Sequence, residues 1–214
     1  MGQFSVGVNS LGLYLPGPKS EGGRALSKET IALFDVRVDE QGFACFAHTN
    51  LDGHICGWER KCRPDPAKMA QSSRDEKMRT TQFLTGGRKR LFITHIDPGK
   101  SVKRIVVLES AIDALAHAQM FGGPREIYIS HSGRPSNDAL NQLKELLLKH
   151  PSSELVLAHD NDETGNKLAA IVKELAPSTM QVTRETPNLK DWNEDLQQID
   201  EMRRKEDLMI GRRR

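Results

Sequence analysis

Cysteine is scarce and irregularly spaced in this chain of 214 residues. Cys45, Cys56 and Cys62 are an odd number without a CxxC pair, which argues against a disulfide-stapled secreted fold and against a zinc ribbon. An irregular zinc-binding set that adds His48 and His54 stays open, although buried or strand-borne thiols are favoured. The expected surroundings are therefore a reducing cytoplasm.

Long apolar runs and a strong net charge are also missing. No apolar stretch reaches the roughly 18 residues of a membrane span, and the N-terminus lacks a charged region followed by an apolar core, so no membrane association is expected. The formal charge is only +2, so a nucleic-acid surface must come from local clustering. Each basic cluster taken alone is equally compatible with solvated surface charge. The clusters are Arg60, Lys61 and Arg63; Arg88, Lys89 and Arg90; and Arg203, Arg204, Lys205 and residues 212–214 in the tail.

Residues 104 to about 196 alternate between short aliphatic runs and helical patterns. The runs at 105–108, 127–129, 155–158 and 180–183 are typical of buried parallel strands. Between them, apolar residues recur at helical spacing over 112–120, 140–147 and 168–175. This order fits βαβ units with right-handed crossovers. We therefore predict an α/β fold with a small parallel sheet flanked by helices.

The first 95 residues instead predict a small, mainly antiparallel β subdomain. After an opening rich in Gly and Pro, residues 27–31 can cap a short helix. The turn sequences at 39–42 and 52–53 separate alternating stretches, as in β-hairpins. Residues 197–214 are polar and charged, which predicts a helical extension that ends in a basic tail. The expected units are thus 1–95, 102–196 and 197–214.

Acidic residues stand where two of the predicted parallel strands end. Glu109 follows the run at 105–108, and Asp160 and Asp162 follow the run at 155–158. Carboxylates at such ends meet at one sheet edge, where each raises the pKa of the others unless a cation neutralises them. Each acid alone would suit a helix N-terminus, but three at matching strand ends favour a metal site. Hard oxygen donors suit Mg²⁺ and a phosphate-bearing substrate.

The arrangement of these acids resembles the Toprim domain of primases, topoisomerases and related nucleases. An acid after a strand, a helix with AspAlaLeu and a later DxDxxG carry the resemblance, which covers about residues 102–196. It implies that Glu109 is the first-motif glutamate, that Asp113 is its helical companion, and that Asp160 and Asp162 are the metal-binding pair. It also implies that Gly165 lets the next helix approach the site.

Two further segments indicate which kinds of Toprim protein the chain resembles. Residues 46–61 and 81–92 are similar to the subdomain that precedes Toprim in bacterial primase catalytic cores. Residues 190–196 resemble the C-terminal signature of Toprim proteins carried by plasmids and conjugative elements, often beside relaxases. The resemblance implies Mg²⁺, or Mn²⁺, as the cofactor and DNA, with single strands favoured, as the partner. A relaxase or a replicative helicase is the protein partner that it implies.

Primase-like phosphoryl transfer on nucleic acid is the leading hypothesis. Glu109, Asp160 and Asp162 would be catalytic as metal ligands, and Glu109 could also act as acid or base. His131, expected in the loop after the second strand, is either a phosphate contact or an ordinary loop residue. Basic side chains would follow the nucleic-acid backbone or a nucleotide triphosphate; these are Arg60, Lys61, Arg88, Lys89 and Arg90.

Other residues and other functions also fit this sequence. Asp191 and Asn193 are expected near the metal, and Trp192 is expected to anchor the terminal helix. A nickase or nuclease with the same metal site is the second hypothesis, and a non-catalytic DNA-binding accessory protein of replication or conjugation is the third. A topoisomerase is disfavoured, because Tyr14 lies in a loop-like opening and Tyr128 lies inside a predicted strand.

Overall fold

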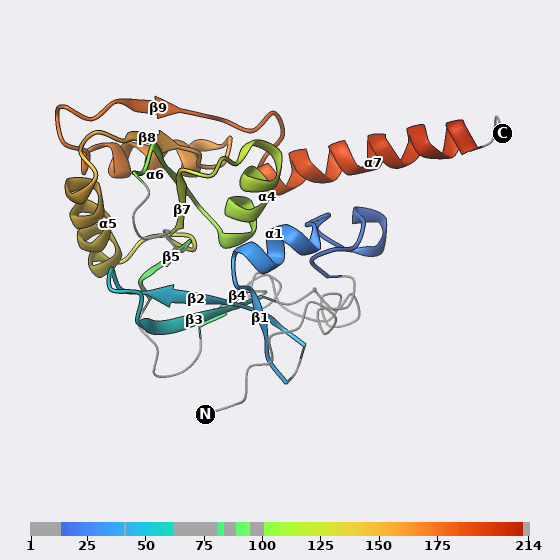
Figure 1. The fold of residues 1–214 in the computed structure, drawn as a ribbon, viewed down its shortest axis with the longest axis horizontal. Coiled ribbons are helices and arrows are strands. Elements are labelled where there is room, and N and C mark those ends of the chain that lie inside the picture. The colour runs from blue at the N-terminus through green and yellow to red at the C-terminus, as the bar shows by residue number, and fades with distance from the viewer. Residues whose placement is uncertain (1–13, 41, 62–80, 84–88, 95–100, 212–214) are drawn as a thin grey trace.

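A computed structural model describes residues 14–40, 42–61, 81–83, 89–94 and 101–211 (Figure 1). Its strands form one mixed sheet in the order β4-β3-β2-β5-β7-β6-β8-β9, with β1 paired to β2. The strands are β1 (Arg37–Val38), β2 (Ala44–Thr49), β3 (Ile55–Lys61), β4 (Thr81–Phe83), β5 (Leu91–Ile93), β6 (Arg104–Leu108), β7 (Glu126–Ser130), β8 (Glu154–Leu157) and β9 (Val182–Arg184). The helices are η2 (Lys19–Glu21), α1 (Lys28–Leu33), α4 (Ala111–Phe121), α5 (Asn137–Lys149), α6 (Glu163–Lys173) and α7 (Trp192–Gly211).

The parallel part of the sheet confirms the predicted α/β fold. β6 lies between β7 and β8, and β9 pairs with β8, all in parallel register. α4, α5 and α6 connect these strands, and each has its side-chain N-cap: Ser110, Ser136 and Asp162. Because β6 and β8 are direct neighbours, residues that follow them emerge at the same edge of the sheet.

Helices cover both faces of the parallel strands, and alternating strand residues face each layer. Val106, Leu108 and Val156 belong to the core beneath α1, α4 and the start of α7. Ile105, Val107 and other strand residues of opposite orientation pack with the apolar face of α5 and with α6. Apolar residues are therefore needed at nearly every strand position, as the sequence runs predicted.

The N-terminal strands are antiparallel, as predicted, and they continue the same sheet. Gly42 and Gly53 have φ values of 80° and 81° in the turns that join β1 to β2 and β2 to β3. β5 pairs antiparallel with β2 on one side and with β7 on the other. The expected boundary near residue 95 is therefore crossed by one continuous sheet.

α7 is the last element, and only its first part packs on the body. Trp192 and Leu196 are 4% exposed and belong to the core, whereas residues 202–210 are all exposed. Figure 1 shows this helix extending away from the rest of the molecule. The boundary expected at residue 197 thus falls inside a helix. Within the described part of the chain, no helix is long and apolar enough to span a membrane.

Candidate metal centre

The ends of β6 and β8 bring the predicted acidic residues to one edge of the sheet. The amide of Ala158 donates to the carbonyl of Val107 at 2.8 Å, so the two strands stay paired up to their last residues. Glu109 follows β6, and Asp160 follows β8 two residues after Ala158. Asp162 is the N-cap of α6, and its Oδ1 accepts from Gly165 N at 2.8 Å.

Two carboxylate oxygens at this edge are buried without a hydrogen-bond partner. They are Oε2 of Glu109 and Oδ1 of Asp160. A buried acceptor without a partner costs about 1–3 kcal/mol, and more when it is charged. Such atoms are rare in folded proteins, so these two oxygens are suited to accept a ligand, an ion or water.

The carboxylates at this edge also repel one another. Burial, followed by the charges of four neighbouring carboxylates, raises the pKa of Asp160 to about 8; the neighbours are Asp113, Glu109, Asp191 and Asp162. Burial, followed by Asp162 and Asp113, also raises the pKa of Glu109. The site therefore favours a bound cation, which would relieve the repulsion among these groups.

The donor set suits a hard divalent cation, although its side chains are not assembled around one. Among the residues that the structure describes, no group of three His, Cys, Asp or Glu side chains is arranged to hold a metal ion. Asp162 is engaged as a helix cap, which accounts for part of this spread. Carboxylates at a strand edge fit Mg²⁺ or Mn²⁺, and binding requires side-chain movement. The assignment of Glu109, Asp160 and Asp162 as ligands stays a prediction.

Asp113, on α4, and Asp191, just before α7, are two further acidic residues near the site. Asp113 is 6% exposed, and it accepts from Ser110 Oγ at 2.5 Å and from Asn193 N at 3.2 Å. Burial and then the charge of Asp191 raise the pKa of Asp113 to about 6. Asp191 Oδ1 accepts from Glu194 N at 2.8 Å. Both acids lie within electrostatic range of the predicted ligands while supporting local backbone.

Gly165 lies where α6 packs against the backbone of the site. A Cβ on this residue would lie 2.2 Å from the carbonyl oxygen of Asp160. Only glycine permits this approach without a shift of the backbone. The close packing brings the N-terminus of α6 against the backbone of Asp160.

The segment that holds these carboxylates matches a known protein family. A family model described as Toprim-like matches residues 106–196, from the middle of β6 into α7. The chain is therefore similar to Toprim-like proteins over residues 106–196, a segment named the Toprim-like domain. The match includes all five carboxylates that gather at the sheet edge. No curated protein matches the chain.

The likeness to solved structures extends beyond the Toprim-like domain and includes the N-terminal strands. The primase fragment of the bacteriophage T7 primase-helicase protein is 20% identical, with a TM-score of 0.55 over 79% of this chain and 64% of that chain. The Escherichia coli primase catalytic core is 15% identical, with a TM-score of 0.52 over 79% and 64%. The Aquifex aeolicus primase is 16% identical, with a TM-score of 0.54 over 87% of this chain and 53% of that chain. At these identities the likeness concerns the fold, and the chain spans less than two thirds of each of these three chains.

Lys61 is the predicted basic contact whose charge acts on the carboxylates at the sheet edge. Its Nζ lies 3.3 Å from Glu59 Oε1. Burial opposes its charge, but Glu59 and then Asp113 raise its pKa, and its own charge acts on the pKa of Glu109. The end of β3 therefore places a cation beside the strand edge.

The other predicted basic contacts are engaged with protein groups. Arg60 pairs with Asp39 at 2.6 Å, and its guanidinium lies 4.2 Å from the ring centre of Phe43. Lys89 Nζ donates to a backbone carbonyl at 2.6 Å, and Arg90 lies 3.4 Å from an aspartate of α5. Their contact with nucleic acid stays a prediction. Arg63, Arg88, Cys62 and residues 212–214 lie outside the described residues, and so does part of the possible zinc set.

The phosphate contact considered for His131 is not supported by its position. Its side chain is 1% exposed, Nδ1 bonds to the carbonyl of Gly133, and Nε2 lies 3.0 Å from Nε2 of His159. Burial lowers the pKa of His131 to about 4, so the ring is neutral at pH 7. His131 is thus a buried residue of the loop, and its contact with phosphate stays a prediction.

Arg184 is a residue of the site that sequence reasoning missed. From β9, its guanidinium donates to the carbonyls of Leu157, His159 and Asp160 at 2.9, 2.9 and 3.0 Å. It thereby holds the backbone that leads to Asp160. No local pattern could indicate this role, because it depends on the pairing of β8 with β9.

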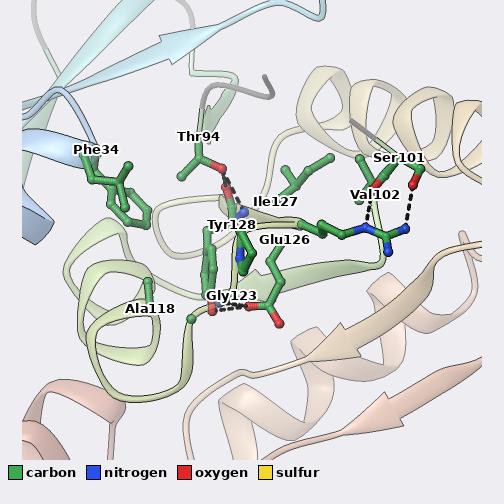
Figure 2. Close-up of a pocket in the computed structure, with 13 residues that line it drawn as sticks. Phe34, Thr94, Ser101, Val102, Ala118, Gly123, Glu126, Ile127 and Tyr128 are labelled. Carbon is green, nitrogen blue, oxygen red and sulfur yellow. Dashed lines mark hydrogen bonds between the residues drawn. The ribbon is translucent and has the colours of Figure 1, made fainter. Parts of the chain in front are cut away.

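A separate cavity of about 420 Å³ lies at the opposite end of the parallel strands (Figure 2). Phe34, Ala118 and Tyr128 are among its lining residues. Figure 2 shows the hydroxyl of Tyr128 bonded to Glu126 and its backbone bonded to Thr94. None of the five carboxylates is among the described residues that line it, so this cavity is distinct from the candidate metal centre.

Proposed function

We propose that this protein carries out metal-dependent phosphoryl transfer on nucleic acid, of the primase type, in DNA replication or in the transfer of mobile elements. The observation that carries the proposal is the pair of buried, unpartnered oxygens of Glu109 and Asp160 at the ends of neighbouring parallel strands. The Toprim-like match and the fold shared with primase catalytic cores support it. A protein that only binds DNA gains nothing from clustered carboxylates close to phosphate.

Glu109, Asp160 and Asp162 would hold Mg²⁺ or Mn²⁺ in this proposal. The ion, when bound, supplies positive charge that stabilises the reacting phosphate oxygens and orients the attacking hydroxyl. Glu109 is the carboxylate that would accept a proton from that hydroxyl. Lys61 would bind a phosphate group from the side of β3. Asp113 and Asp191 would keep the electrostatic field negative enough to retain the cation.

A single-stranded DNA template is the proposed partner, with a replicative helicase as protein partner. One structure with this fold is described as a primase catalytic domain bound to single-stranded DNA, with a TM-score of 0.53 over 79% of this chain. The T7 fragment belongs to a primase-helicase protein. No observation of the structure or the comparisons supports a relaxase as the partner.

The test compares the wild-type chain with Asp160→Asn, which keeps the shape of the side chain and removes its charge. Both are assayed with Mg²⁺ or Mn²⁺ on single-stranded and supercoiled DNA, with and without labelled nucleotides. We expect nucleotide incorporation by the wild type and none by Asp160→Asn, while the matched variant Asp52→Asn in an exposed turn stays active. Nicking without incorporation would replace the proposal by a nuclease. DNA binding without either activity would favour an accessory role.

A further inference from the structure

Residues 130–133, which begin at the last residue of β7 and are called the 130–133 loop, have an unusual backbone. Ser132 and Gly133 have φ values of 55° and 76°. Glycine adopts such values freely, but a serine there is strained and is kept only where its surroundings hold it. Ser130, His131 and Ser132 are 0%, 1% and 8% exposed. The contacts of this loop therefore explain why the strained conformation is kept.

One set of contacts reaches Glu109. The amide of Gly133 donates to the carbonyl oxygen of Glu109 at 2.9 Å, and Ser130 Oγ donates to the same oxygen at 3.3 Å. Ser130 Oγ also accepts from Ser132 N at 3.1 Å. The backbone of Glu109, just beyond the end of β6, is thus fixed by the 130–133 loop.

A second contact reaches the residue before Asp160. The rings of His131 and His159 stack with their centres 5.1 Å apart, and their Nε2 atoms lie 3.0 Å apart. Because Nδ1 of His131 donates to the carbonyl of Gly133, its Nε2 accepts and His159 donates. His159 is fully buried. The same loop therefore also fixes the chain that leaves β8.

A third set of contacts reaches the N-terminal strands. Ser132 Oγ donates to Glu59 Oε2 on β3 and lies 3.2 Å from His48 Nε2 on β2. Glu59 and His48 are 1% and 0% exposed. A buried carboxylate and a buried ring that share one hydroxyl leave little freedom for Ser132. The loop is thus joined to β2 and β3 through a single side chain.

We propose that the 130–133 loop is the positioning element of the candidate metal centre, and that Ser132 transmits the position of β2 and β3 to Glu109 and Asp160. The inference rests on the proposed function for the role of the two acids, but Ser132 itself touches no predicted ligand. In this proposal the antiparallel N-terminal strands do more than extend the sheet. Through Ser132 they fix the backbone near both Glu109 and Asp160.

Four full-length proteins test this role: wild type, Ser132→Ala, Ser132→Gly and Ser153→Ala. Ser132→Ala removes only the hydroxyl, whereas Ser132→Gly removes the whole side chain but adopts the φ value without strain. Ser153 is the matched control, because it is 4% exposed and donates to the Val102 carbonyl at 2.9 Å, before the start of β8. Titration calorimetry measures the Kd for Mn²⁺, and urea unfolding measures stability.

Both Ser132 variants are expected to bind Mn²⁺ roughly tenfold more weakly, as for groups that orient metal ligands. Ser153→Ala is expected to lose stability without losing Mn²⁺ affinity. Wild-type affinity in Ser132→Ala would overturn the proposal. Wild-type affinity in Ser132→Gly would also overturn it, because the hydroxyl would then be dispensable.

Amide hydrogen exchange without metal separates this inference from the proposed function. Ser132→Ala should speed exchange at residues 109–110 and 158–161, whereas Ser153→Ala should not. Unchanged exchange at both segments would overturn the positioning role. If the wild type bound no Mn²⁺, the proposed function would fail, and the exchange pattern would still decide what the 130–133 loop does.

Discussion

At the scale of single residues, Gly165 is where α6 packs directly against the backbone of the candidate metal centre. A Cβ at Gly165 would meet the carbonyl oxygen of Asp160 at 2.2 Å, and that oxygen belongs to backbone that cannot rotate away. Gly165→Ala is therefore expected to lower the free energy of unfolding by about 1–3 kcal/mol. It should also weaken Mn²⁺ binding, because Asp160 must shift. Urea unfolding and titration calorimetry measure the two effects.

Gly123→Ala is the matched control for this substitution. The nearest atom to its added Cβ is 3.6 Å away, in the side chain of Glu126, so ordinary contact results. Neither stability nor Mn²⁺ affinity should fall in this variant. Equal losses in Gly165→Ala and Gly123→Ala would mean that the approach to Asp160 has no special importance.

Glu59 gives the molecule a pH dependence that can be assigned to one residue. Burial by itself raises its pKa, but Lys61, followed by His48 and Ser132, lowers the pKa to about 2 from the ordinary 4.5. A carboxylate whose pKa is depressed by folding stabilises the fold above its unfolded-state pKa. That contribution should be lost as the pH falls from 4.5 to about 2. Denaturant unfolding at a series of pH values measures the loss.

Glu59→Gln should be less stable than wild type at pH 7 and should show a flatter pH profile in the acidic range. The control is Glu145→Gln on α5, where the exposed pair with Lys149 is expected to contribute little. Its profile should follow wild type. A wild-type slope in Glu59→Gln would show that other carboxylates cause the acid sensitivity.

At the scale of elements, β9 supports the end of β8 through Arg184. The guanidinium donates to the carbonyls of Leu157, His159 and Asp160, which a lysine ammonium cannot reach together. Arg184→Lys should weaken Mn²⁺ binding about tenfold, as other supporting groups of metal sites do. Arg125→Lys, which alters a guanidinium bonded to Ser101, should keep wild-type affinity. Equal affinity in both variants would contradict the role of Arg184.

The parallel strands and their helices were predictable because each carries its own local signal. The aliphatic run at 105–108 lies in β6 (Arg104–Leu108), and the helical spacing at 112–120 lies in α4 (Ala111–Phe121). Burial on both faces requires such runs, and a cap such as Ser110 marks the helix start. The pairing of β5 with both β2 and β7 was not predictable, because three residues contain no signal for distant partners.

The same distinction applies to the candidate metal centre. Glu109 and Asp160 were predictable at the same edge of the sheet, because the carboxyl ends of parallel strands lie at one edge. The contacts that hold them were not, because Arg184 reaches the Leu157 carbonyl 27 residues away and Ser132 reaches Glu59 73 residues away. Such contacts follow from strand order, which local periodicity does not determine.

At the scale of the whole molecule, the continuous sheet makes the two expected units interdependent. β5 is the only described strand that joins the antiparallel part to the parallel part, through β2 and β7. Ser132, close to this joint, adds the buried contacts to Glu59 and His48. The N-terminal strands and the Toprim-like domain are therefore expected to unfold together rather than as separate units.

The molecule as a whole should depend on the first half of α7 and not on its second half. Trp192 is 4% exposed and donates from Nε1 to the carbonyl of Ala158 at 2.7 Å, whereas residues 202–210 are exposed. Trp192→Ala is expected to cost about 3–5 kcal/mol of unfolding free energy. Ending the chain after Glu201 should leave stability and Mn²⁺ affinity close to wild type. Urea unfolding compares the two variants, and a truncation as damaging as Trp192→Ala would mean that the second half of α7 packs on the body.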